Sequence, residues 1–149
     1  MKLIIQRVSS AAVVRKKDGK VFGQIKDGLF VLLGIKKGDS KTQANFLVDK
    51  LLKLRILPDS RDLMNLSLVD KKADVLVVSQ FTLYADTKGG RRPSFVQAET
   101  PKKAKILYQY FIDLLKENGV NVKTGSFGDY MEINVKLDGP VTIIYEKDN

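Results

Sequence analysis

A chain of 149 residues, 44% of them hydrophobic, fits a single soluble domain, which we expect to span residues 1–149. Its 26 Lys and Arg outnumber its 17 Asp and Glu, and a net charge of +9 suits a polyanionic partner such as RNA, although any lysine-rich surface would look the same. The absence of Cys and His excludes disulfides, thiol nucleophiles, Ser-His-Asp triads and the common zinc sites.

The apolar segments predict a protein made mostly of strands. They have period-two or continuous patterns, at Leu3–Val8, Ala11–Val14, Val21–Ile25, Leu29–Ile35, Val75–Tyr84, Val120–Thr124, Tyr130–Leu137 and Val141–Tyr145. Asp27-Gly28, between two of these runs, is typical of a hairpin. The longest unbroken apolar run, Leu29–Leu33, is too short to cross a bilayer, and we expect a cytoplasmic protein.

Two segments have helical periodicity. The first covers Lys41–Leu54, with a capping-box pattern at Ser40 and Gln43. The second begins with Thr100 as N-cap before Pro101 and ends at Asn118-Gly119. Because strands outnumber helices, the sequence predicts an α+β fold, with a mixed, largely antiparallel sheet and two main helices packed on it.

Polar side chains break the apolar pattern at the end of one predicted strand. Ser79, Gln80 and Thr82 follow the apolar run Val75–Val78, where a buried strand should stay apolar. They could donate hydrogen bonds to a ligand at the strand end. A strand that leaves the core has the same pattern, and the pattern alone favours this second interpretation.

Three glycine-containing segments have equally open interpretations. Lys88–Phe95 combines Gly89-Gly90 with clustered Lys and Arg residues, which suits either phosphate contact or a solvated turn. The glycines around Phe127 would let the backbone approach a ligand and leave the ring free to stack on a base. Asp138-Gly139-Pro140 is also a common turn sequence.

Taken in order, these motifs resemble the D-aminoacyl-tRNA deacylase family, also known as D-tyrosyl-tRNA deacylases. The resemblance runs from Met1 to about Tyr145 and rests on Gln6-Arg7-Val8, Ser79-Gln80-Phe81-Thr82-Leu83-Tyr84, Arg92-Pro93-Ser94-Phe95, Thr124-Gly125-Ser126-Phe127-Gly128 with Met131, and Asp138-Gly139-Pro140-Val141-Thr142. The family often has Asn where this chain has Leu137 or Arg91. The second departure adds a positive charge where tRNA contact is expected.

The resemblance implies a barrel-like, homodimeric enzyme that hydrolyses the ester bond of D-aminoacyl-tRNA and also acts on glycyl-tRNA. We expect it to need no metal or cofactor, because the chain lacks Cys and His and no Asp/Glu cluster has metal-ligand spacing. It further implies that Gly139-Pro140, joined by a cis bond, enters the partner's pocket as a backbone wall that excludes L side chains. Arg7 would hydrogen-bond carbonyls near this wall and hold its orientation.

The residues expected to carry the chemistry follow from the same resemblance. Backbone N–H groups around Phe81 and Thr82 are the candidate donors to an oxyanion. Thr82 has no evident base, so we expect it to position substrate or water, with the 2′-hydroxyl of the terminal adenosine assisting. The expected catalytic residues are Gln80, Phe81 and Thr82, and the expected substrate-binding residues are Ser79, Phe127, Met131, Gly139, Pro140 and Arg7.

Two other functions remain open on the same fold. One is a non-catalytic RNA- or DNA-binding module, and the other is an editing domain that acts on L-aminoacyl-tRNA. The intact Ser79–Thr82 segment and Gly139-Pro140 argue against the binding module, which has no need of a backbone wall that selects D over L. The intact Gly139-Pro140 also argues against the editing domain, in which a changed loop would admit the L side chain.

Overall fold

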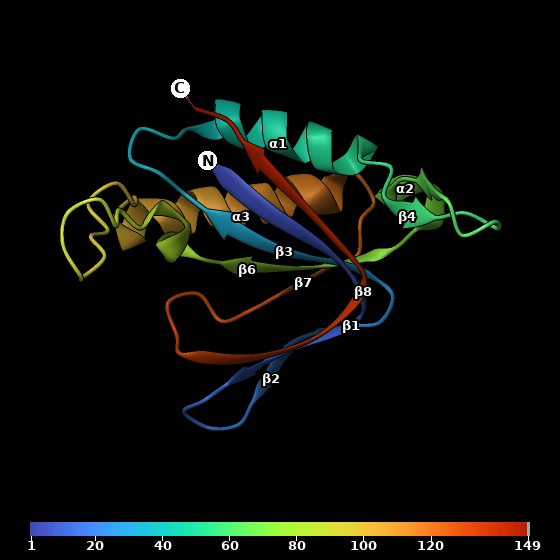
Figure 1. Cartoon of the computed structure of the whole chain (residues 1–149), viewed down its shortest axis with the longest axis horizontal. Coiled ribbons are helices and arrows are strands. Elements are labelled where there is room, and N and C mark those ends of the chain that lie inside the picture. Colours follow the sequence, from blue (N-terminus) through green and yellow to red (C-terminus); the bar gives the residue numbers. More distant parts are fainter. Residues whose placement is uncertain (149) are drawn as a thin grey trace.

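A computed structural model describes residues 1–148 of the chain and shows a curved sheet with helices packed on one face (Figure 1). Its six strands are β1 (Lys2–Arg15), β2 (Val21–Ile25), β3 (Gly28–Gly34), β6 (Asp74–Ser79), β7 (Val122–Thr124) and β8 (Met131–Glu146). The pairs β1–β2, β1–β3 and β1–β8 are antiparallel, whereas β3–β6 and β6–β7 are parallel. The predicted mixed α+β fold is confirmed.

The sheet curls until its ends nearly meet. β2 and β7 lie at opposite ends of the strand order, yet a Cβ on Gly23 of β2 would lie 2.6 Å from the carbonyl oxygen of Thr124 in β7. Only glycine fits such a close approach of two backbones. The result is a barrel-like sheet that is almost closed.

The bend of β1 divides the buried side chains into two clusters. Leu3 and Ile5 face the helices, whereas Val8, Ala11 and Val13 face the inside of the curled sheet. The buried face changes between residues 5 and 8, where the ladder between β1 and β8 also shifts its register. One long strand can therefore serve both cores.

Two long helices, α1 (Lys41–Lys53) and α3 (Pro101–Glu117), cover the outer face of the sheet. The capping box of Ser40 and Gln43 is present at the start of α1. After α3, Gly119 adopts a positive φ of 78°, as its sequence position predicted. No helix among residues 1–148 is long and apolar enough to cross a membrane.

Several predicted boundaries were wrong. Asp27-Gly28 is not a hairpin: β2 and β3 pair with the same edge of β1, since β8 occupies the other. Gly28 is needed because a Cβ there would lie 2.1 Å from the carbonyl oxygen of Asp74. The expected strand Val75–Tyr84 ends at Ser79 and is followed by the 3₁₀ helix η1 (Phe81–Tyr84).

The remaining differences concern continuity and short elements. Each of β1 and β8 is one long strand where two were predicted. Three short elements between α1 and β6 had no signal in the pattern: β4 (Leu57–Pro58), β5 (Met64–Leu66) and α2 (Leu68–Lys71).

Candidate functional site

The predicted site residues gather at two ends of the central strand β6. The first group, which we call the η1 end, comprises Ser79–Tyr84 and the segment Gly125–Met131. The second group, which we call the turn end, comprises Arg7 and Asp138–Val141. Pairing of Val77 with Thr124 places the first group beyond the carboxyl end of β6.

At the η1 end, the start of the 3₁₀ helix leaves two neighbouring backbone donors free. The N–H of Gln80 donates to Leu33 O at 2.9 Å, and that of Leu83 donates to Gln80 O at 3.3 Å. Between them, the N–H groups of Phe81 and Thr82 donate to no acceptor within residues 1–148. Free N–H groups are expected in the first turn of a helix, and a pair of them can bind an oxyanion.

The side chains of this segment give Thr82 a polar partner and no base. The amide Nε2 of Gln80 donates to the hydroxyl of Thr82. Within the described chain, this hydroxyl makes no hydrogen bond to a carboxylate or to a lysine amine. Thr82 is exposed, so its proton remains available to an incoming group.

The segment Gly125–Met131 places an aromatic ring and a thioether beside the end of β6. The N–H of Gly125 donates to Val77 O at 3.2 Å, and the N–H of Ser126 lies 3.2 Å from the sulfur of Met131. Phe127 is half-buried and packs on Tyr108, with ring centroids 5.5 Å apart. Burial raises the pKa of Tyr108, whose hydroxyl donates to Val77 O and fixes the ring that supports Phe127.

A basic loop, which we define as residues 87–93, rises from the same end. Its base is closed by two backbone hydrogen bonds between Asp86 and Ser94, at 2.7 and 2.8 Å. Phe95, just after the loop, packs edge-on against Phe81 with centroids 5.0 Å apart. The basic side chains Lys88, Arg91 and Arg92 are exposed on this loop. It lies at the left of Figure 1.

At the turn end, four residues of β8 bulge from the ladder with β1. Gln6 pairs with Thr142 and Val8 pairs with Leu137, so residues 138–141 lie opposite Arg7 alone. The Gly139–Pro140 bond is cis, as expected, and φ of Gly139 is +124°. Both residues are exposed, and the bulge therefore projects from the sheet edge.

Arg7 braces this bulge in a way that differs from the prediction. Its Nη1 donates to Ile56 O at 3.0 Å, and its Nε lies 2.8 Å from Asp138 Oδ2. The second contact is an ion pair, because the N–H is poorly aligned for a hydrogen bond. The expected hydrogen bonds to carbonyls of the turn are thus replaced by contacts with a neighbouring carboxylate and with Ile56.

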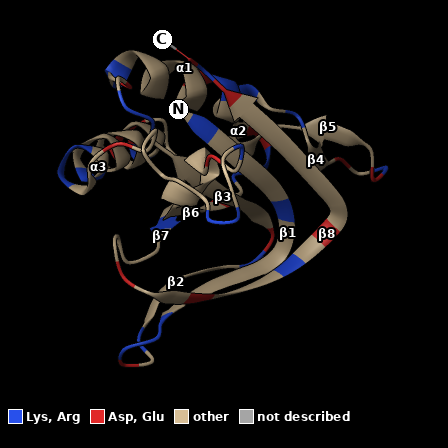
Figure 2. Ribbon diagram, turned by 60° about the vertical axis from the view of Figure 1, so that its left-hand side comes forward, with Lys and Arg blue, Asp and Glu red and all other residues tan. Residues whose placement is uncertain are grey.

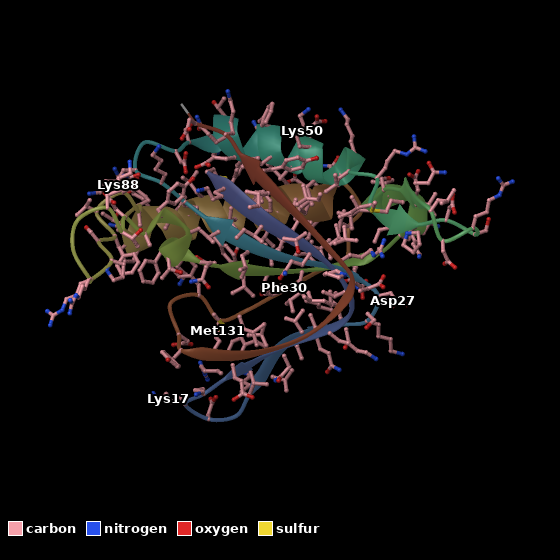
Figure 3. The ribbon with its side chains drawn as sticks, in the orientation of Figure 1. Lys17, Asp27, Phe30, Lys50, Lys88 and Met131 are labelled. Atoms are coloured by element: carbon pink, nitrogen blue, oxygen red, sulfur yellow. The ribbon has the colours of Figure 1, made fainter. Side chains whose placement is uncertain are left out.

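The two ends are far apart within one chain. Along β6, residue 74 pairs with Gly28 near the turn end, and Ser79 pairs with Leu33 near the η1 end. Five residue steps of a strand span about 17 Å. Asp27, which lines a cavity of about 410 Å³ together with Arg7 and Asp138, lies opposite Met131 and Lys88 in Figure 3. One chain therefore does not bring all predicted site residues together.

The sequence interpretation missed a network that anchors the Phe127 segment. Arg15 donates to Asp18 and, at 3.3 Å, to Asp129, and Asp129 also accepts from the hydroxyl of Ser126. The hydrogen bond from Arg15 is the main cause that lowers the pKa of Asp18 to about 2. The sequence signal for this network was the Asp18-Gly19 turn, which places one carboxylate among Lys and Arg residues.

No three His, Cys, Asp or Glu side chains among residues 1–148 are grouped as metal ligands would be. Two carboxylates that flank the η1 end in sequence are already engaged. Asp129 binds Arg15 and Ser126, and Asp86 accepts from the N–H of Lys88 at 2.9 Å.

Comparisons with known proteins agree on one family. The family model described as D-Tyr-tRNA(Tyr) deacylase matches residues 4–146. A protein named D-aminoacyl-tRNA deacylase from Thermosipho melanesiensis is 50% identical over 147 residues, covering 98% of this chain and 97% of that protein. The protein of the same name from Aquifex aeolicus is 51% identical over 146 residues, with coverage of 98% and 97%.

Two solved structures share the fold over nearly the full chain. The c-Myc DNA Unwinding Element Binding Protein superposes with a TM-score of 0.91 at 35% identity and covers 100% of both chains. A probable eukaryotic D-amino acid tRNA deacylase superposes with a TM-score of 0.81 over 97% of both chains. At 18% identity, the second likeness concerns the fold alone.

Proposed function

The chain belongs to the D-aminoacyl-tRNA deacylase family and is a hydrolase of aminoacyl-tRNA, and we propose that two copies of it complete each active site. One observation carries the proposal. The free N–H pair of Phe81 and Thr82 and the Gly139-Pro140 bulge lie at opposite ends of β6. A second copy is the simplest source of a bulge that reaches the η1 end.

In the proposed reaction, a water oxygen attacks the ester carbonyl that joins the D-amino acid to the terminal ribose. The carbonyl oxygen becomes an oxyanion and accepts hydrogen bonds from the N–H groups of Phe81 and Thr82. The bond to the ribose oxygen then breaks, that oxygen takes a proton, and the products are a free D-amino acid and tRNA. Two fixed donors stabilise charge that develops only in the transition state.

Proton transfer is assigned to the substrate, because the chain has no histidine and Thr82 has no base. The 2′-hydroxyl of the terminal ribose is next to the ester and can relay a proton from the attacking water to the leaving 3′ oxygen. Thr82, held by the amide of Gln80, positions the water or the substrate. The reaction therefore needs no cofactor.

The terminal adenosine is assigned to the segment beside the end of β6. Phe127 and Met131 offer a ring and a thioether for contact with the base, and Ser79–Phe81 offers polar groups for its edge and for the ribose. Because Phe127 is supported by Tyr108, its ring would hold the adenine at a fixed distance from the two N–H donors.

We assign the discrimination between D- and L-amino acids to the bulge of the partner copy. The backbone of Gly139-Pro140 would lie against the α-carbon of the bound amino acid, where an L side chain would collide with it and a D side chain would point away. Glycine has no side chain to exclude, so glycyl-tRNA would also be a substrate. The contacts of Arg7 with Asp138 and Ile56 would keep the bulge in place.

A complementation experiment tests this arrangement. The double variant Gln80→Ala/Thr82→Ala lowers kcat at the η1 end but keeps both backbone donors, and Gly139→Val displaces the bulge and so lowers selectivity. If the two ends act across a dimer, mixing the two variants under conditions of subunit exchange restores about a quarter of the sites, because each mixed dimer has one site built from two intact ends.

The control is each variant mixed with itself: the double variant keeps selectivity at low kcat and Gly139→Val loses selectivity, so recovery is counted as D-specific activity above both homodimers. If the site lay within one chain, each mixed dimer would carry two damaged sites, and the absence of any recovery would refute the proposal. Mixed dimers are verified by mass, with a tag on one of the two variants.

DNA binding is a second candidate function, favoured by the name of one structural neighbour, c-Myc DNA Unwinding Element Binding Protein. The net charge of +9 suits either nucleic acid. Competition separates the two functions: duplex DNA that binds more tightly than tRNA at equal salt would favour DNA binding, whereas weaker DNA binding supports the deacylase assignment.

A further inference from the structure

A second basic loop lies beside the η1 end, formed by the tip of the hairpin that joins β1 to β2. We define this hairpin tip as residues 15–20. Lys16, Lys17 and Lys20 are all exposed on it. The N–H of Lys16 donates to Tyr130 O at 2.9 Å, which ties the tip to the segment that carries Phe127 and Met131.

The positive charge of the hairpin tip is not balanced by its acidic neighbours. Asp18 and Asp129 both bind the guanidinium of Arg15. Lys16, Lys17 and Lys20 form no ion pair with a carboxylate within residues 1–148; the amines of Lys16 and Lys20 lie over the rings of Tyr130 and Phe22, at 5.6 and 5.3 Å from the centroids. These three lysines are therefore exposed and, within the described residues, not neutralised by an ion pair.

The hairpin tip and the basic loop of residues 87–93 lie on opposite sides of the same site. In Figure 3, Lys17, Met131 and Lys88 follow one another along one end of the molecule, with Met131 between the two lysines. The turned view of Figure 2 shows Lys and Arg residues on both loops, which are separated by the segment that joins β7 to β8. An elongated polyanion that reached Phe127 and Thr82 would pass between two basic surfaces.

We propose that the hairpin tip binds phosphates of the single-stranded 3′ end of tRNA, opposite the basic loop, so that the strand lies between two positively charged loops. This inference rests on the proposed function, since it assumes that the terminal adenosine occupies the η1 end. It assigns Lys16, Lys17 and Lys20 as contacts to the RNA backbone.

The anchoring of the tip explains how such a contact would assist the reaction. Arg15 pairs with Met131 in the ladder and also binds Asp129, so the tip and the Phe127 segment form one connected unit. A phosphate held by the lysines would thus be fixed relative to the groups that contact the adenosine, which lowers the cost of ordering the 3′ end on binding and therefore lowers KM.

The test compares two substrates with a charge-matched control. The triple variant Lys16→Gln/Lys17→Gln/Lys20→Gln removes the charges of the tip. Its control, Lys50→Gln/Lys53→Gln/Lys116→Gln, removes three exposed charges from the outer helices. Each protein is assayed on D-tyrosyl-tRNA and on 3′-D-tyrosyl-adenosine, which has the ester and the adenosine but no phosphate.

For the tip variant, we expect KM on the tRNA to rise about fivefold for each lost contact at 0.1 M salt, and the salt dependence of tRNA binding to become shallower. Its kcat on the tRNA and its activity on D-tyrosyl-adenosine should stay at the wild-type level. Combining it with Lys88→Gln/Arg91→Gln/Arg92→Gln should multiply the two losses, because the two loops contact different phosphates.

Three results would overturn the inference. The tip variant and the control variant could lose tRNA affinity equally, which would indicate a diffuse charge effect. The tip variant could lose equal activity on both substrates, which would indicate a structural role. The combined variant could be no weaker than one of its parents. Wild-type protein inactive on both substrates would instead refute the proposed function, and this inference with it.

Discussion

The η1 end and the turn end of β6 are built from different kinds of chemical group. The η1 end offers two free backbone donors and a hydroxyl, and it continues a strand that is buried on both faces. The turn end offers an exposed backbone bulge on an outer strand, held by an ion pair between Arg7 and Asp138. One end can stabilise charge, whereas the other can only present a shape.

This difference explains why the two tasks of a stereospecific hydrolase can be placed on separate parts of one chain. Donors to an oxyanion must be fixed by a rigid core. A backbone bulge that excludes L side chains must protrude far enough to reach a substrate bound at the η1 end. The proposed two-fold dimer would satisfy both requirements, because each chain would supply both parts to different sites.

The largest effect is expected when the shape of the bulge is changed. In Gly139→Ala, the new Cβ would lie 2.8 Å from the backbone nitrogen of Val141, in a residue whose φ is +124°. The bulge must therefore shift. We expect the ratio of D to L activity, measured on D- and L-tyrosyl-tRNA, to fall about 100-fold, since a displacement of about 1 Å in a positioning group has such an effect.

Gly119→Ala is the matched control for this variant. Gly119 also has a positive φ, of +78°, but a Cβ there would meet nothing within 4 Å, and the residue follows α3. It should lose stability and keep its D-to-L ratio. Unchanged selectivity in Gly139→Ala would show that the bulge is not the wall.

A smaller effect is expected from a change at the η1 end. Thr82→Ala removes a hydroxyl and its bond to Gln80 but keeps both backbone donors. We expect kcat to fall about tenfold without loss of selectivity, which is the value of one neutral hydrogen bond in the transition state. Thr82→Ser should retain most activity. An acyl-enzyme ester trapped on Thr82 would contradict a purely positioning role.

Arg7→Lys tests the brace of the bulge while keeping its charge. A lysine has one amine and cannot reach both Asp138 and Ile56 O as the guanidinium does. We expect the D-to-L ratio to fall about threefold, with kcat on D-tyrosyl-tRNA little changed, because loss of one contact costs about 1 kcal/mol or less. A fall in kcat at constant selectivity would place Arg7 in the chemistry instead.

Sequence patterns predicted the helices and the sheet, because these depend on periodicities that extend over many residues. They failed where tertiary partners decide. Val75–Tyr84 reads as one strand, yet beyond Ser79 neither β3 nor β7 continues to pair with it, and the chain turns into η1. The free donors of Phe81 and Thr82 exist because of that turn.

The site could be predicted only as a set of residues, not as an arrangement. The family motifs named Gln80, Thr82 and Gly139; in the structure Gln80 and Thr82 are hydrogen-bonded to each other at the start of η1, and Gly139 precedes the cis bond. Nothing in the spacing indicated that Gly139 lies a full strand length from Thr82, because that distance depends on the course of β6 and β8 together. Arg15 was missed since its two carboxylate partners are 3 and 114 positions away.

The smallest expected effect is that of metal removal, and it bears on both ends at once. At the η1 end, Asp86 and Asp129 are held by local hydrogen bonds, and at the turn end Asp138 is held by Arg7. Recruiting any of them to a metal would break a contact that shapes the loop or the bulge.

We therefore expect activity on 3′-D-tyrosyl-adenosine to be unchanged after exhaustive chelation. This substrate is the informative one, because tRNA itself needs magnesium to fold. Loss of activity on it, with recovery on adding zinc or magnesium, would show that the oxyanion is stabilised by a metal and not by the two N–H groups alone.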